Sequence, residues 1–220
     1  MDRVESTQEG STDMQKQKAI HHTVADWDWV GPTNRDLDTG LYVSPPSSLR
    51  IGILPGISTV IGLCRVPDTL CIPNGRFQSW SRRLVIDNSY YWHFRNQAAL
   101  GSADRQNTYV IDFSSIGTYL RYYLSGGSHS VASFDWLHPA GEWVHLRVTF
   151  EEVPNPANGK RLAVTLEREV AGQWLQLGNI AYENNNYWSD SAINRLGFEG
   201  YCGANYVNHL DDTKIYKKAG

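Results

Sequence analysis

The sequence predicts an all-β protein that folds as an antiparallel β-sandwich. Short runs rich in β-branched and aromatic residues recur along the chain, and Gly, Pro, Asn, Asp and Ser separate them. No long segment carries the sustained period of about 3.6 residues that an amphipathic helix requires. With 220 residues and 41% hydrophobic content, the chain can bury one substantial core, and an all-β domain of this size need not be divided.

The N-terminal residues differ in composition from the rest. Residues 1–18 are rich in Glu, Gln, Ser, Thr and Lys and have little apolar surface to bury, so they cannot offset their own ordering entropy. We therefore predict a polar, extended arm over residues 1–20 and a single jelly-roll domain over residues 21–220. The arm lacks the apolar core of a secretory signal, and no later apolar run is long enough to cross a bilayer, which leaves the localisation open.

Eight segments fit strands. Each is short, carries β-branched or aromatic residues and is bounded by turn residues. In chain order they are residues 49–53, 75–80, 82–87, 90–97, 108–113, 118–124, 143–153 and 160–170. Many short strands separated by loop signals favour a sandwich or jelly roll over a helical or mixed fold.

The clearest strand pattern lies at residues 143–153. Its apolar residues alternate with polar ones and fall on one face: Val144, Leu146, Val148 and Phe150. Residues 160–170 repeat the pattern, with an apolar face made of Leu162, Val164 and Leu166. The pair Asn158-Gly159 between them is a strong hairpin signal, so we expect the two strands to be adjacent and antiparallel.

The order of segments in the second half of the chain resembles that of a known superfamily. A tryptophan-led strand, GEWVHLRVTF, is followed by a hairpin into KRLAVTLEREVAGQWLQL, a polar loop, INRLGFEGY and finally HLDDTKIY. This order is similar to that of the concanavalin A-like lectin and glucanase superfamily, especially its laminin-G-like members. The resemblance implies a jelly roll of two curved antiparallel sheets whose first and last strands are neighbours. Lectins, polysaccharide hydrolases and lyases, adhesion modules and viral surface proteins share this fold, so function depends on the site.

The catalytic patterns of the enzymes in this superfamily are absent from the sequence. Its glucanases carry E-x-D-x-x-E on one strand, because alternate residues place carboxylates on one face. Glu167 and Glu169 share a face, but Arg168 lies between them near a strand end, and we interpret them as a solvated edge. His93 lacks the lyase pattern and is interpreted as a satisfied or exposed imidazole. We therefore predict no enzymatic activity, and a polysaccharide hydrolase or lyase is the least favoured alternative.

Aromatic residues in polar settings mark a candidate ligand site. Sugar sites combine an aromatic platform with amide, hydroxyl or carboxylate groups that bind the sugar hydroxyls. The segments 88–97 and 183–190 both have this composition. The predicted ligand-binding residues are Tyr187, Trp188, Asn184, Asn185, Asn186 and Trp92. The same residue types also occur as ordinary aromatics on sheet faces and as loop asparagines without any ligand. We therefore keep a carbohydrate-binding, lectin-like domain as the alternative function rather than the first one.

Our first functional hypothesis is a non-enzymatic binding or adhesion module. The N-terminal arm and the absence of a catalytic pattern fit a structural or decoration protein on a virus (phage) particle or another surface assembly. Its partners would be a glycan or protein surface, and virion or homo-oligomeric neighbours reached through the arm. The net charge of -3 and pI near 6.1 give no basic field for nucleic acid, and we expect no membrane insertion.

The aspartates of the closing segment suggest an optional structural calcium. In several members of the superfamily such an ion lies where the first and last strands meet, and Asp211 occupies the matching position. Asp26 and Asp28 are the other candidate ligands. The alternative is that the aspartates hold a turn by accepting backbone N–H bonds.

The three cysteines leave the redox state open. Cys64 and Cys71 flank a predicted turn and could form a short-loop disulfide in an oxidising compartment. The odd number of cysteines favours free thiols that pack as small hydrophobes.

Overall fold

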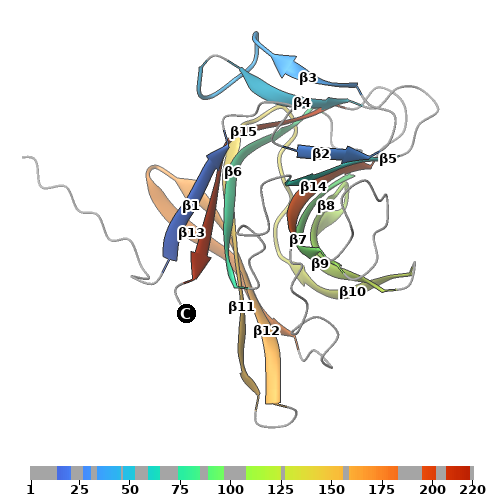
Figure 1. The fold of residues 1–220 in the computed structure, drawn as a ribbon, viewed down its shortest axis with the longest axis vertical. Helices are drawn as coiled ribbons and strands as arrows, with labels where there is room; N and C mark the ends of the chain where they lie inside the picture. Colours follow the sequence, from blue (N-terminus) through green and yellow to red (C-terminus); the bar gives the residue numbers. More distant parts are fainter. Residues whose placement is uncertain are drawn as a thin grey trace, which may run out of the picture.

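The chain folds into two antiparallel sheets packed face to face (Figure 1). The computed structural model describes residues 14–20, 27–30, 34–45, 47–52, 59–64, 74–84, 89–96, 108–124, 127–155, 159–182, 195–201 and 207–218. Its regular elements are strands, and no helix in this part of the chain could span a bilayer. The predicted all-β sandwich is therefore confirmed.

One sheet has eight strands in the described ranges. Seven of them follow the order β13 (Gln173–Tyr182), β12 (Gly159–Val170), β11 (Val144–Asn155), β6 (Gly75–Arg83), β15 (Val207–Lys218), β4 (Ser48–Gly52) and β3 (Asn34–Asp38). The eighth, β1 (Met14–Ile20), pairs with β15 beyond the β4 segment. The first and last described strands are therefore neighbours, as the resemblance implied.

The second sheet has seven strands and curves strongly, with its concave side turned away from the eight-stranded sheet (Figure 1). Its order is β10 (Gly127–Phe134), β9 (Gly117–Leu124), β8 (Thr108–Ser114), β7 (Ser89–Asn96), β14 (Arg195–Tyr201), β5 (Thr59–Cys64) and β2 (Trp27–Val30). Strands distant in sequence thus meet in its centre, where β14 pairs with β7.

Part of the predicted N-terminal arm forms a strand, β1. Residues 14–20 lie within the predicted arm, yet they form a strand antiparallel to β15, from Met14 opposite Lys218 to Ile20 opposite Thr213. The backbone of β15 supplies hydrogen-bonding partners that the polar composition of the arm did not reveal. This part of the predicted arm therefore belongs to the sheet.

The core lies between the sheets and follows the predicted alternation. Leu146, Phe150, Val164 and their alternate neighbours on β11 and β12 are buried, and the two strands pair as the predicted hairpin. The inward residues of β7 pack against them from the other sheet, with the rings of Phe94 and Phe150 4.9 Å apart. Alternation thus sends every second residue over much of β7, β11 and β12 into one core.

Trp92 belongs to this core. Its side chain has 0% exposed surface, and its ring lies 4.9 Å from Phe77 and 5.6 Å from Phe113. A fully enclosed ring cannot stack on a sugar, so this placement contradicts the prediction that Trp92 binds a ligand. Segment 90–97 carries aromatic residues at both alternate sets of positions, and the sequence pattern therefore could not tell its inner face from its outer face.

Candidate functional site

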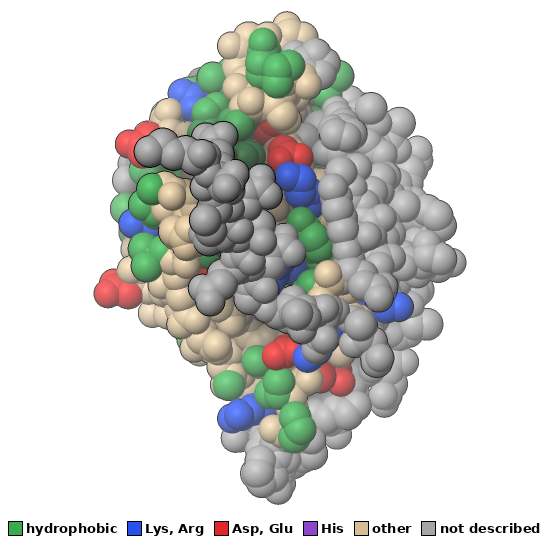
Figure 2. Space-filling view, turned by 90° about the vertical axis from the view of Figure 1, so that its left-hand side faces the viewer, with side chains coloured by type: hydrophobic (Ala, Val, Ile, Leu, Met, Phe, Trp, Pro, Cys, Tyr) green, Lys and Arg blue, Asp and Glu red, His purple; other side chains and the backbone are tan. Residues whose placement is uncertain are grey.

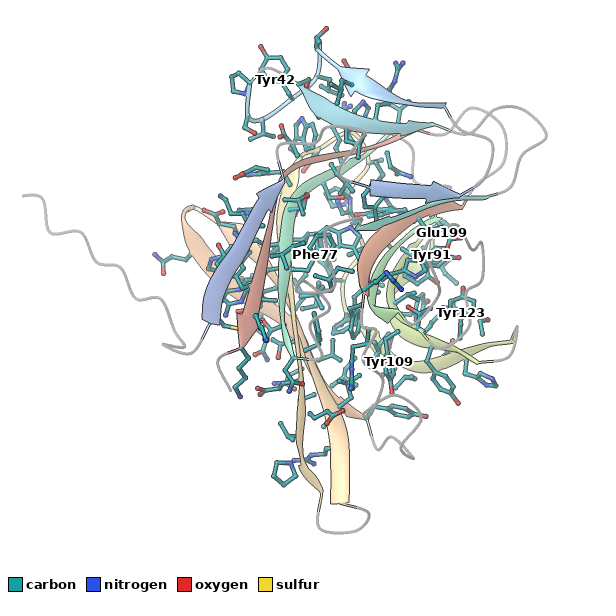
Figure 3. The ribbon with its side chains drawn as sticks, in the orientation of Figure 1. Tyr42, Phe77, Tyr91, Tyr109, Tyr123 and Glu199 are labelled. Atoms are coloured by element: carbon teal, nitrogen blue, oxygen red, sulfur yellow. The ribbon has the colours of Figure 1, made fainter. Side chains whose placement is uncertain are left out.

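The concave face of the seven-stranded sheet carries a cluster of tyrosines and charged residues. These side chains alternate with the core residues of the same strands and point away from the core, where Tyr91, Val110 and Tyr123 form a separate apolar group. Figure 3 shows Tyr91, Tyr123 and Glu199 on this side, whereas Phe77 lies between the sheets. We call Tyr91, Asp112, Tyr119, Arg121 and Tyr123 the concave-face cluster.

The register of the strands brings the cluster together. Asp112 on β8 lies between Tyr91 on β7 and Tyr119 on β9 in one cross-strand row, and β8 and β9 join in a tight turn that pairs Ser114 with Gly117. Residues directly opposite on neighbouring strands have side chains within contact distance. The pattern Tyr-x-Arg-x-Tyr on β9 then adds Arg121 and Tyr123 to the same face.

Asp112 and Arg121 form the polar centre of this cluster. Arg121 Nε lies 2.7 Å from Asp112 Oδ2, and the guanidinium lies 5.2 Å from the centre of the Tyr119 ring. The Asp112 side chain is 4% exposed and that of Arg121 26%. Asp112 Oδ1 is buried and accepts no hydrogen bond from the described residues. Burial raises the pKa of Asp112 to about 6, with Arg121 acting against the rise and Glu199 adding to it.

A buried hydrogen-bond chain lies beside the cluster. His93 Nε2 is 3.0 Å from Glu199 Oε2, and His93 Nδ1 is 3.4 Å from Thr108 Oγ1. The order of hydroxyl, imidazole and carboxylate is that of nucleophilic hydrolases. However, the three residues are almost wholly buried, and Thr108 Oγ1 also lies 3.1 Å from the Tyr109 carbonyl oxygen, so the hydroxyl is not presented to a substrate. Of the two states expected of His93, satisfied or exposed, the structure shows the satisfied one.

The outer face of the eight-stranded sheet also carries aromatic and charged residues, but its carboxylates are paired. Arg147 donates to both carboxylate oxygens of Glu167 and lies 4.1 Å from the centre of the Trp174 ring. Glu169 bonds His145, which stacks on Trp80. Figure 2, viewed from the side of β1 and β15, shows acidic, basic and hydrophobic side chains intermixed. Glu167 and Glu169 are thus each hydrogen-bonded to a basic residue. This differs from the interpretation of the two residues as a solvated edge.

Burial of His145 among these rings affects its protonation. Its ring lies 4.7 Å from Trp80 and 4.8 Å from Trp174, and burial lowers the pKa of His145, although the bond to Glu169 acts in the opposite direction. The imidazole therefore serves as a neutral stacking element between two tryptophans near neutral pH.

Asp211, the predicted calcium ligand, is surrounded by hydrogen-bond donors. The backbone N–H groups of Val43 and Ser44 donate to its Oδ2 at 2.6 and 2.8 Å. The Ser44 hydroxyl and the Asp212 N–H donate to Oδ1, each at 2.7 Å. This arrangement supports the alternative in which the aspartate holds the backbone, and most of the donors come from a distant segment. Among the described residues, no group of three or more His, Cys, Asp or Glu could hold a metal ion.

Several predicted site residues lie outside the described part of the chain. These are the loop residues Asn184, Asn185, Asn186, Tyr187 and Trp188, together with Asp26, Cys71 and the side chains of Asp28 and Cys64. The ligand-binding role of the loop, the calcium and the disulfide therefore remain predictions.

The concave-face cluster was not predicted from the sequence. A usable signal was present, because Asp112 is the single charged residue in the otherwise uncharged run of residues 108–113. A lone carboxylate on a strand of this kind, next to the alternating Tyr119, Arg121 and Tyr123, indicates a polar site on a sheet face.

Comparisons with known proteins agree on the fold. No protein-family model and no curated protein sequence matches the chain. The exoplasmic/lumenal domain of VIP36, in its Ca2+/Man3GlcNAc-bound form, matches 90% of this chain and 86% of its own, with a TM-score of 0.58 and 11% identity. The carbohydrate recognition domain of Emp46p matches 89% and 90%, with a TM-score of 0.54 and 11% identity.

A third solved structure comes from a virus. The conserved carbohydrate esterase of Shiga toxin-encoding bacteriophage phi24B matches 90% of this chain and 92% of its own, with a TM-score of 0.51 and 13% identity. Lectin domains and an enzyme thus share this architecture, and at such low identity the likeness concerns the fold. The chain adopts the concanavalin A-like lectin fold that its sequence predicted.

Proposed function

We propose that the chain is a carbohydrate-binding module that binds its ligand at the concave-face cluster. The observation that carries the proposal is the buried Oδ1 of Asp112, which accepts no hydrogen bond from the described residues. Among the buried side-chain atoms that lack a partner in the described residues, Asp112 Oδ1 is the one carboxylate oxygen. Buried polar atoms are almost always bonded, so a strong acceptor of this kind beside an arginine and several tyrosines supports a site for a donor from a ligand.

The chemistry of the cluster suits a sugar. A carboxylate accepts hydrogen bonds from sugar hydroxyls, and the half-buried Arg121 donates to ring or hydroxyl oxygens. The half-buried ring of Tyr119 can pack on the apolar face of a pyranose, whereas Tyr91 and Tyr123 are buried. The glycan-bound VIP36 domain and the Emp46p carbohydrate recognition domain support this reading, because both have the same fold.

The other readings have less support. The decoration-protein hypothesis relied on an arm that orders on a neighbouring subunit, whereas residues 14–20 pair with β15 of the same chain. A phage carbohydrate esterase has a similar fold, but in the described residues of this chain the carboxylates of Glu167 and Glu169 are held by Arg147 and His145. Carbohydrate binding without catalysis is therefore the function we place first.

A matched pair of substitutions tests the site. Asp112 and Glu167 are both carboxylates on an outer sheet face, each paired with an arginine that lies over an aromatic ring. On a glycan array followed by calorimetry, Asp112→Asn should weaken binding roughly 10- to 100-fold, the effect of losing a charge-assisted hydrogen bond. Glu167→Gln should bind like the wild type. Equal binding by Asp112→Asn and the wild type would remove the cluster as the site.

A further inference from the structure

We propose that Glu199, fixed by His93 beside the concave-face cluster, is a positioning residue that makes ligand binding at Asp112 sensitive to mild acid. The inference rests on the proposed carbohydrate-binding function, and it assigns a regulation to that same site. Glu199 itself is buried and is not part of the surface offered to the ligand.

The strand register places the two carboxylates in one row. Glu199 on β14 lies opposite Tyr91 on β7, Tyr91 lies opposite Asp112 on β8, and Asp112 lies opposite Tyr119 on β9. Glu199 and Asp112 are thus two strands apart, about 10 Å at the backbone given the usual spacing between strands. Both point to the concave face, with Tyr91 between them.

Hydrogen bonds hold Glu199 in this row. His93 Nε2 lies 3.0 Å from its Oε2, and both side chains have 0% exposed surface. Thr108 Oγ1 lies 3.4 Å from the other nitrogen of the ring and fixes the imidazole in turn. A carboxylate held in this way cannot swing into solvent, and burial leaves its effect on Asp112 weakly screened.

The described elements around Asp112 supply few compensating charges. The titratable or charged side chains that share its face are Tyr91 and His93 on β7, Tyr119, Arg121 and Tyr123 on β9, and Glu199 on β14. Arg121 is the permanent cation of this set and forms an ion pair with Asp112. A second carboxylate in the row therefore favours the neutral form of Asp112.

This arrangement links binding to pH. Burial, with a contribution from Glu199, raises the pKa of Asp112 to about 6. As the pH falls through this value, Asp112 gains a proton, loses its negative charge and weakens its bond to Arg121. The charge-assisted acceptor that we assign to the sugar hydroxyl disappears at the same point, so the ligand is released.

The experiment measures affinity for the best array glycan between about pH 8 and pH 4.5. The wild type and Glu167→Gln should both lose affinity around pH 6, by about tenfold across two pH units. In Glu199→Gln the midpoint should move to lower pH, by up to about one pH unit for charges about 10 Å apart in a protein interior. An unchanged midpoint, or pH-independent binding by the wild type, would overturn the inference.

A second measurement, which compares the wild type with Glu199→Gln, is independent of the ligand. The Asp112 side-chain carboxyl carbon can be titrated by NMR in the wild-type protein, where we expect a midpoint of about 6. A midpoint near the ordinary value of 3.8 would refute the coupling even if a glycan binds. Conversely, the absence of any glycan ligand together with an Asp112 midpoint that is lower in Glu199→Gln than in the wild type would sink the proposed function while leaving the coupling of Glu199 to Asp112 intact.

Discussion

Replacing Asp112 with asparagine should weaken ligand binding and, at neutral to alkaline pH, stabilise the fold. Burial raises the pKa of Asp112 from 3.8 to about 6, so the folded state holds this proton more tightly than the unfolded state. The free energy of unfolding therefore falls as the pH rises from about 4 to 6 and stays lower above that range.

The size of this effect follows from the two pKa values. The difference between 3.8 and about 6 corresponds to about 3 kcal/mol, at 1.36 kcal/mol per pKa unit. Asparagine removes the buried charge but leaves its amide imperfectly bonded, so we expect a net gain of about 1–3 kcal/mol near pH 8. Arg121, at 26% exposure, can hydrate once its partner is neutral.

Urea unfolding of the wild type and Asp112→Asn across this pH range provides the assay. The difference between the two curves isolates Asp112, because the buried His138, His145 and His209 titrate in both proteins. We expect the difference to be small near pH 4 and to grow through pH 6. If Asp112→Asn is the less stable protein near pH 8, then the carboxylate is stabilised by its surroundings, and the reasoning behind the site fails.

Two further predictions concern the stability of the fold. Gly178→Ala places a methyl group 2.6 Å from the Phe134 ring, and we expect a loss of about 1–3 kcal/mol in urea unfolding. Gly40→Ala, whose methyl group would have its nearest contact at 3.5 Å, is the control and should cost less than Gly178→Ala. Asp211→Ala removes the acceptor for residues 43–44 and should cost about 2–4 kcal/mol in thermal unfolding, to the same extent with and without a calcium chelator. A loss that appears only when calcium is present would instead support the calcium site.

The sequence was sufficient to predict the strands whose two faces differ in polarity. Residues 143–153 and 160–170 alternate cleanly, and the Asn158-Gly159 pair identifies their connection, so strand assignment, facing and pairing were all predictable. Residues 90–97 have aromatic side chains at both alternate positions, and Arg95 adopts a positive φ of 52° that interrupts the alternation. A periodic pattern could not place Trp92 for these reasons.

The site depends on register between strands that are distant in sequence. The contact of Asp112 with Arg121 follows from a local hairpin and could be inferred from the two neighbouring segments. The approach of Glu199 to the same row requires β14 to pair with β7 across more than a hundred residues. Local propensities do not encode such pairings, because they arise from the packing of the whole core.

The pairing of β1 with β15 fixes where the two ends of the described domain emerge. Met14 lies directly opposite Lys218, at the side of the sandwich remote from the concave face (Figure 1). A short linker between these positions would give a circular permutant with new ends in a surface loop. The same corner can also serve as a single attachment point, so the described domain could be tethered through either end on the side remote from the concave face.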